Sequence, residues 1–185
     1  MQKPLIVRAS QALALGCIWL LSGLSALAAA PLSTPAQQVT EWQRAKDYSR
    51  EYLEAMPEAG VSFKPNPDIR SFAEQWLHVA NANYMFAASI SGKTNPNQGR
   101  NLEKMDEFKT KAALAKVVMD SYDFVISALQ ETTEAQMGEK IKLFNQEVTR
   151  DLGYAKAFEH QTHHRGQTTI YLRMKGVKPP QEKLF

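Results

Sequence analysis

Cysteine is almost absent from this sequence. The 185 residues include one cysteine, Cys17, which lies in an apolar N-terminal segment that we expect to be removed. The mature chain would therefore hold no thiol. This excludes disulfide bonds, a cysteine nucleophile and a thiolate metal ligand from the folded protein.

Acidic side chains are missing from the first 28 residues. This segment begins with Lys3 and Arg8, continues as an apolar run and ends in Ala26-Leu27-Ala28, which is the pattern of a cleaved secretory signal. The alternative is a retained membrane anchor, but the run is short for the roughly 20 residues that a span needs. We expect residues 1–28 to be a signal peptide and the mature protein to be periplasmic or secreted, without stable membrane association.

The mature chain also lacks a strong excess of charge of one sign. The formal net charge is +3, from 22 Lys and Arg against 19 Asp and Glu. Removing residues 1–28 takes away two cations and leaves 20 against 19, a net charge of +1. No basic patch stands out, so we expect no nucleic-acid partner. About 157 residues remain (185 − 28), enough for one compact domain with a core.

Helical patterns account for most of the mature chain. Apolar residues recur at helical spacing in four long segments, and capping residues, proline or glycine mark their ends. The predicted helices are Thr40–Met56, Pro67–Ser91 with Asn66 as its N-cap, Leu102–Glu131 and Arg150–Lys175. Residues 138–149 stay open between a short helix and a strand-like loop.

No alternating strand pattern and no internal repeat interrupt these helices. The predicted fold class is therefore all-α, and four helices of this length in one small domain indicate a four-helix bundle. We expect residues 29–39 to be a flexible lead-in, residues 40–180 to form the bundle domain and residues 181–185 to be a C-terminal tail.

Histidine is scarce, yet three of the four histidines fall within the stretch EHQTHHRGQ of the last predicted helix. At 100° per residue, His160 and His164 share one face, which Gln167 and Tyr171 continue, while Arg165 points the other way. The histidine face should meet the bundle core. Burying its polar groups without partners would cost roughly a few kcal/mol each.

A bound divalent metal would satisfy the two imidazoles. Histidines four residues apart on a helix converge on one ion, and the third ligand must come from another helix. His78 is the only histidine that remains outside the cluster. Three histidines leave coordination positions open for water or substrate, as catalytic sites do, with zinc or nickel preferred over iron or manganese. We expect His163, which faces off this axis, not to be a ligand.

The spacing alone leaves a plainer alternative open. Histidine pairs four apart also occur on exposed faces or with ordinary hydrogen-bond partners. On its own helix, His78 lies opposite Ile69 and Trp76, which favours a solvated side chain. The helix from Trp76 to Ile90 is apolar on most sides, however, and this permits a second buried face.

Three segments resemble one known family. HQTHHRGQTTIYLRMKGVKPP is similar to the C-terminal signature of the DinB/YfiT-like family of metalloproteins, and FAEQWLHVANANYMF and VSFKPNPDIRSF resemble its second helix and the link into it. The resemblance spans Trp42 to Pro180. It implies a four-helix bundle with a long crossover connection, often as a homodimer. It also implies a divalent metal held by three histidines, here His78, His160 and His164.

The resemblance further implies a class of activity. Characterised relatives include transferases and isomerases that use low-molecular-weight thiols. The export signal departs from the family, because many relatives look cytosolic and cytosolic thiols are scarce outside the cytoplasm.

Three functions fit these features. The first is a metal-dependent enzyme of the hydrolase or thiol S-transferase type that acts on a small molecule. In it, Glu74 or Tyr171 would assist proton transfer, and Gln167 and Asn81 would orient the bound ligand; an ordinary exposed acid is the alternative for Glu74. The second is a non-catalytic metal or small-ligand binding protein. The third is a structural bundle with a vestigial site.

Overall fold

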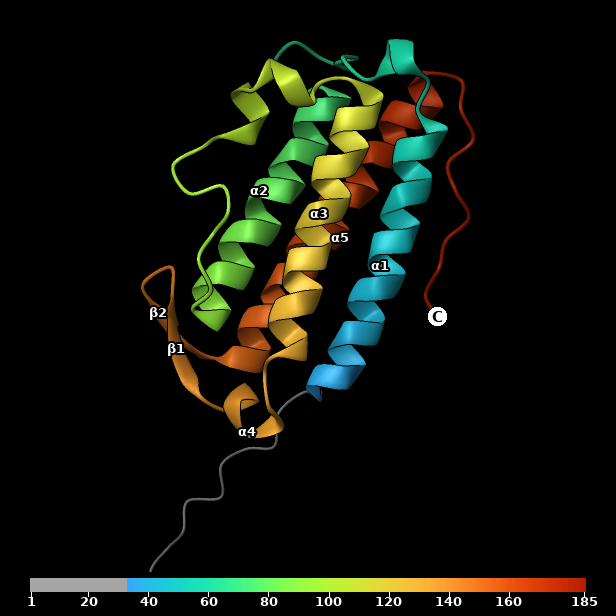
Figure 1. Cartoon of the computed structure of the whole chain (residues 1–185). Coiled ribbons are helices and arrows are strands. Elements are labelled where there is room, and N and C mark those ends of the chain that lie inside the picture. Colours follow the sequence, from blue (N-terminus) through green and yellow to red (C-terminus); the bar gives the residue numbers. More distant parts are fainter. Residues whose placement is uncertain (1–32) are drawn as a thin grey trace, which may run out of the picture.

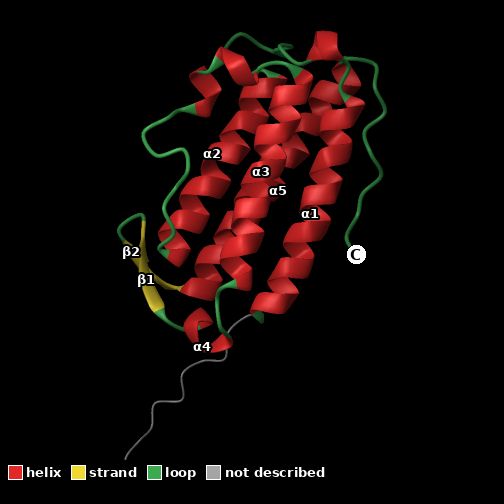
Figure 2. Cartoon of the chain, viewed as in Figure 1, coloured by secondary structure: helices red, strands yellow, loops and turns green. Residues whose placement is uncertain are grey.

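Four long helices build the molecule (Figures 1 and 2). The computed structural model describes residues 33–185, so the predicted signal peptide lies outside the described residues. The long helices are α1 (Pro35–Ala55), α2 (Phe72–Ser91), α3 (Lys111–Gln130) and α5 (Arg150–Met174). The prediction of an all-α bundle is confirmed.

The connection between α2 and α3 is the long crossover of the bundle. Both α1 and α2 pack against α3 and α5, so α1 and α2 lie diagonally across the bundle. In Figure 1, α2 and α3 run in the same direction, which forces residues 92–110 to return along the length of the bundle. Two short 3₁₀ helices, η2 (Leu102–Lys104) and η3 (Asp106–Phe108), lie in this segment.

The other short elements lie between the long helices. A 3₁₀ turn, η1 (Glu58–Gly60), follows α1, and α4 (Glu134–Met137) follows α3. Residues 138–149, which the sequence left open, contain an antiparallel hairpin of β1 (Lys140–Leu143) and β2 (Gln146–Thr149). At its tip, Phe144 and Asn145 both have positive φ, 48° and 65°, as a tight two-residue hairpin turn requires.

The core is aromatic at its centre. Trp42, Trp76 and Tyr122 are fully buried. The Tyr122 hydroxyl is 2.8 Å from the Ser49 hydroxyl, and its ring meets the ring of Trp42 edge-on at 5.7 Å. These contacts join α1 to α3, and the buried hydroxyls of Ser49 and Tyr122 satisfy each other, whereas the indole nitrogen of Trp42 has no hydrogen-bond partner among the described residues.

The predicted starts of the first two helices are wrong. α1 begins at Pro35, because Thr34 and Gln37 form a capping box, so the last residues of the predicted lead-in are helical. α2 begins after Ser71, which forms a capping box with Glu74. Asn66 instead accepts a hydrogen bond from the Asp68 amide in a local turn, at 2.9 Å.

The third helix and the predicted apolar stripe of the second are also corrected. Thr110 caps α3, so this helix starts nine residues after the predicted Leu102. Ile69 lies in the loop before α2 and is 44% exposed, because no helix carries it toward the core.

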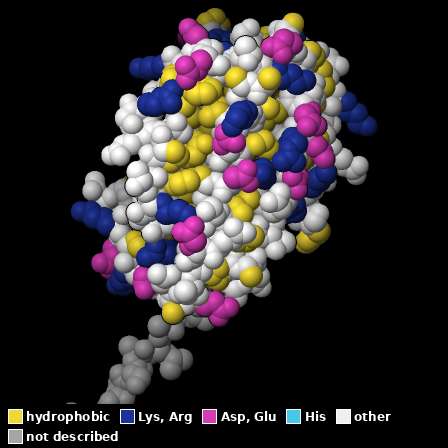
Figure 3. All heavy atoms as spheres, viewed as in Figure 1, with side chains coloured by type: hydrophobic (Ala, Val, Ile, Leu, Met, Phe, Trp, Pro, Cys, Tyr) yellow, Lys and Arg dark blue, Asp and Glu magenta, His cyan; other side chains and the backbone are white. Residues whose placement is uncertain are grey.

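The face of the bundle seen in Figure 3 carries interspersed cations and anions, and no histidine is visible on it. None of the helices within residues 33–185 combines the length and hydropathy needed to cross a membrane.

Gly153 sets how closely α5 approaches α2. A Cβ at this position would lie 3.1 Å from Cγ1 of the buried Ile90 and 3.4 Å from Cδ1 of Ile141. We expect Gly153→Ala to destabilise the protein by about 1–3 kcal/mol, since overpacking exceeds the gain of about 1 kcal/mol in helix propensity. Thermal unfolding measures this change.

Gly166 in the same helix is the matched control. An added Cβ there would meet nothing within 4 Å. Gly166→Ala should therefore raise the melting temperature, and a fall of similar size in both variants would contradict the argument from packing.

Candidate metal centre

Three imidazole rings meet where α2 packs against α5. The ring of His78 in α2 lies 5.2 Å from that of His160 and 4.5 Å from that of His164, and the two α5 rings are 4.4 Å apart. Each residue offers one ligand nitrogen, and these nitrogens all lie within 4.8 Å of one another. The structure thus brings together the trio that the sequence selected, and the His78 side chain is only 26% exposed.

The environment keeps the two α5 histidines neutral. Burial, followed by the proximity of His78 and His163, lowers the pKa of His160 to about 4. Burial and the neighbouring His160 and His78 lower the pKa of His164 to about 3. A metal needs the neutral imidazole as its ligand, so at neutral pH these rings are already in the binding form.

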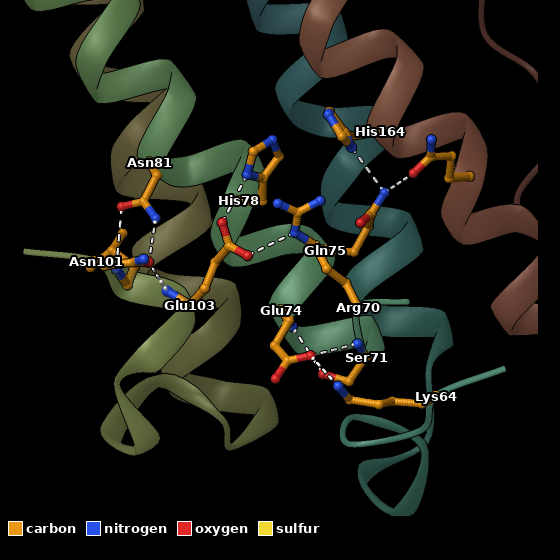
Figure 4. A network of polar contacts seen from close by, with 12 residues as sticks. Lys64, Arg70, Ser71, Glu74, Gln75, His78, Asn81, Asn101, Glu103 and His164 are labelled. Atoms are coloured by element: carbon orange, nitrogen blue, oxygen red, sulfur yellow. Dashed lines mark hydrogen bonds and ion pairs between the residues drawn. The ribbon is translucent and has the colours of Figure 1, made fainter. Parts of the chain in front are cut away.

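Glu103, which the sequence analysis did not select, orients His78. Its Oε1 is 2.8 Å from His78 Nδ1, and its Oε2 accepts a hydrogen bond of 2.7 Å from Arg70 Nε (Figure 4). Burial alone would raise the pKa of this carboxyl, but His78 and Arg70 lower the pKa to about 2. The ionised carboxylate holds the proton of His78 on Nδ1 and leaves Nε2 free to bind a metal.

Asn81 holds the segment that carries Glu103. Its Oδ1 accepts from the Leu102 amide and its Nδ2 donates to Asn101 Oδ1, each at 3.3 Å (Figure 4). Asn81 was predicted to orient a bound ligand, and that role stays a prediction. In the structure, Asn81 contacts Asn101 and Leu102 and so fixes the start of η2 beside His78.

A chain of amides leads away from His164. Gln75 Nε2 lies 2.9 Å from His164 Nδ1 and also contacts Gln167 Oε1. Gln167 Nε2 in turn is 2.8 Å from His163 Nε2. Gln167 thus connects to the trio through Gln75, and the ring of His163 also packs on that of His164, at 4.9 Å. If Nε2 of His164 held a metal, Nδ1 would carry the proton, and the amides of both Gln75 and Gln167 would turn end for end to accept it and keep the hydrogen bond between them.

His160 provides the test of fit for a cation. Its Nδ1 is one of the few buried side-chain nitrogens within residues 33–185 that has no hydrogen-bond partner. Leaving a buried polar atom unsatisfied costs about 1–3 kcal/mol. A cation held by the cluster would give the His160 ring a partner that the described residues do not supply. Because each of the three histidines offers a nitrogen within 4.8 Å of the others, the residues present fit a divalent metal.

Comparison with known proteins agrees with this geometry. The sequence model of the DinB family matches residues 31–184, which include nearly all of the described residues. This chain belongs to the DinB family. Its bundle and its three-histidine cluster are therefore features of a DinB protein, and the resemblance found in the sequence is confirmed.

Relatives with solved structures share the fold. The chain is 26% identical to the uncharacterized protein YjoA of Bacillus subtilis over 144 residues, which is 76% of this chain and 90% of YjoA. The crystal structure of YjoA, a DinB-like protein, has a TM-score of 0.61 and covers 80% of this chain and 96% of its own. A DinB-like protein from Bacillus cereus, 17% identical, has a TM-score of 0.69 over 80% of this chain and 97% of that chain.

In this DinB protein, Glu74 and Tyr171 line a cleft of about 840 Å³ that Arg70, Glu103 and Gln167 also line. None of the three clustered histidines lines this cleft, which approaches them through Gln75 and Glu103, the partners of His164 and His78. The Tyr171 hydroxyl donates to the Arg70 carbonyl at 2.7 Å, and burial raises its pKa. Roles for Glu74 and Tyr171 in proton transfer stay predictions.

Glu74 already serves two structural contacts. Its carboxylate accepts from the Ser71 amide at 2.8 Å and pairs with Lys64 at 3.1 Å (Figure 4). Burial would raise the pKa of Glu74, but the Ser71 and Lys64 contacts lower it. A proton acceptor near neutral pH needs a higher pKa, so these contacts favour a structural role at the start of α2.

Arg165 points away from the histidines, as its place on the wheel predicted, and it is buried against a neighbouring helix. It is only 7% exposed, its Nη1 donates to Gln161 Oε1 at 2.9 Å, and its guanidinium lies 4.6 Å from the centre of the Tyr48 ring. The reason is that α1 covers the face of α5 opposite the histidines.

Glu103→Gln should weaken metal binding. The amide is a poorer acceptor for His78 Nδ1 and ends the ion pair with Arg70, so the affinity for Zn²⁺ should fall about 10- to 100-fold. Competition titration against a chromogenic chelator measures the change. Glu107→Gln is the control, because Glu107 pairs with Arg100 at 2.8 Å in the same connection and is not part of the cluster. Equal losses in both variants would contradict the assigned role.

The metal-free protein should lose stability on mild acidification. The unfolded chain binds protons at histidines near pH 6.5, whereas folded His160 and His164 stay neutral down to about 4 and 3. The contribution of these two residues to the free energy of unfolding is therefore fully present above about pH 6.5 and declines as the pH falls below that value. Thermal unfolding with chelator between about pH 7.5 and 5 measures this decline before Glu103 begins to titrate. A double variant, His160→Ala with His164→Ala, should show a flatter profile, and an equally steep one would refute the assignment.

Proposed function

We propose that this DinB protein is exported to the periplasm or beyond and works there as a metal-dependent enzyme of the hydrolase or thiol S-transferase type. The observation that carries the proposal is the convergence of His78, His160 and His164, whose ligand nitrogens lie within 4.8 Å of one another. Sets of three neutral imidazoles are typical of catalytic metal centres.

The donor set decides which cations fit. Three histidine nitrogens without a thiolate suit zinc or nickel, with iron or manganese as alternatives. When bound, such an ion supplies Lewis acidity toward a water, thiol or carbonyl group in the positions that the protein leaves open.

The surrounding residues prepare and position this centre. Glu103 holds His78 in one orientation and lends a negative charge beside the cation, and Gln75 does the same for the ring of His164 without charge. The adjoining cleft of about 840 Å³ is large enough for a small-molecule substrate. Arg70 lines it, so a polar or anionic part of a substrate would find a cation there.

Hydrolysis is favoured over thiol transfer. The mature chain has no cysteine, so any thiol must arrive with the substrate. Small thiols are scarce in oxidising compartments outside the cytoplasm. Both arguments follow from the proposed export of the protein.

A non-catalytic metal carrier is the second candidate. The same three histidines would bind the metal in a carrier. Elemental analysis, described below, separates the enzyme and the carrier, which both hold metal, from a bundle with a vestigial site. A hollow that His160 itself lines supports the enzyme over the carrier, since a carrier has no need to admit a second molecule to the ion.

Elemental analysis of the purified mature protein tests the metal. We expect about one divalent ion per chain. His78→Ala, His160→Ala and His164→Ala should each lose the ion or reduce its affinity strongly. His163→Ala is the matched control from the same helix, because His163 is not part of the trio. An absence of metal in wild-type protein that has been offered zinc and nickel would refute the proposal.

A further inference from the structure

A second hollow reaches the histidine cluster and shares no lining residue with the cleft beside Tyr171. Its volume is about 530 Å³, within the range of small-molecule sites. It lies between the hairpin, the middle of α2 and the first half of α5. Its apolar walls are Phe86, Leu143, Phe144, Val148 and Leu152, and we call it the aromatic hollow.

One of the candidate metal ligands forms part of this hollow. His160 lines it directly, and the ring of Phe86 lies 5.8 Å from the ring of His160. The cleft beside Tyr171, by contrast, reaches the cluster only through residues such as Gln75 and Glu103. A molecule in the aromatic hollow would therefore lie against a ligand of the metal.

Phe144 at the hairpin tip is unusual in two ways. Its backbone has a φ of 48°, a left-handed conformation that costs a bulky residue about 1–2 kcal/mol and that glycine or asparagine adopts more easily. Its side chain is 60% exposed, so burial does not explain why a phenyl group occupies this position. The ring meets Phe86 edge-on at 5.2 Å and forms a wall of the aromatic hollow.

Charge at the rim is balanced. The two charged residues that line the hollow, Lys156 and Glu159, form an ion pair with each other at 2.7 Å. The hollow therefore offers an apolar surface without a net charge, which suits an uncharged apolar group.

We infer that the aromatic hollow binds an apolar, ring-sized group of the substrate, with Phe144 and Phe86 as its walls, while a polar head on the same molecule reaches the metal. This inference rests on the proposed function. It assigns the substrate class as a small molecule that joins an aromatic or branched aliphatic group to an oxygen, nitrogen or sulfur donor.

Two hydroxamates that share one metal-binding head test the inference. Acetohydroxamate carries a methyl group and benzohydroxamate a phenyl group, and calorimetric titration of the zinc-loaded protein gives the affinity of each. We expect benzohydroxamate to bind about 10- to 100-fold more tightly, since burial of the phenyl ring adds to an equal head-group contribution.

Variants at the hairpin tip identify the wall. Phe144→Gly should bring the two affinities to within about threefold, and it should not lower the melting temperature, because glycine tolerates a positive φ. Phe144→Asn, which also tolerates this conformation, should behave in the same way. Asn145→Gly is the matched control, since Asn145 has a φ of 65° in the same turn and no ring to lose. It should keep the wild-type preference.

The outcomes separate the inference from the proposed function. If zinc-loaded protein binds neither hydroxamate, the open metal centre fails and the inference falls with it. If both bind with equal affinity, the inference is overturned and the metal centre stands. A preference that survives Phe144→Gly overturns it too. Loss of the preference for benzohydroxamate in Ile170→Ala would also overturn the inference. Ile170 lines the cleft beside Tyr171, so that result would place the phenyl group in the cleft.

Discussion

The close packing of α2 on α5 is the contact on which the rest of the structure depends. Gly153 lets the two helices approach over Ile90, and the histidines of α5 then lie opposite His78. Because the rings are partly withdrawn from water at this contact, burial lowers the pKa of both His160 and His164 and keeps them neutral. The same contact therefore provides the geometry of the site and the protonation state that a metal requires.

The crossover connection supplies what the two helices lack. Three neutral imidazoles alone would bind a divalent cation without any negative charge nearby to balance it. Glu103 brings a carboxylate to His78, and its hydrogen bonds with His78 and Arg70 lower the pKa of that carboxylate and keep it ionised. A crossover is needed only because α2 and α3 run in the same direction, so the topology of the bundle and the electrostatics of the centre are linked through one segment.

The sequence predicted what depends on local periodicity. The bundle and the pair of α5 histidines follow from spacing along single helices, and His78 was the only histidine left to complete the trio. Helix starts were less predictable, because Asn66-Pro67-Asp68 has the same local signature as a real cap. Glu103 could not be found, since 25 residues separate it from His78 and the crossover has no periodic pattern. The direction of Arg165 followed from the helical wheel, but its partners, the Tyr48 ring and Gln161, did not, because a wheel says nothing of the neighbouring helix.

Two different environments meet at the histidine cluster, and this restricts the molecules that the site can accept. The cleft beside Tyr171 presents amides, carboxylates and cations together with Ile69, Ile170 and two prolines, whereas the walls of the aromatic hollow are mainly phenyl rings and aliphatic side chains. Under the inferred binding mode, the ligand is amphipathic, with its apolar group in the aromatic hollow and its polar head at the metal beside His160. Strain at Phe144 supports this view, because a costly backbone conformation persists where the ring that it positions has a use.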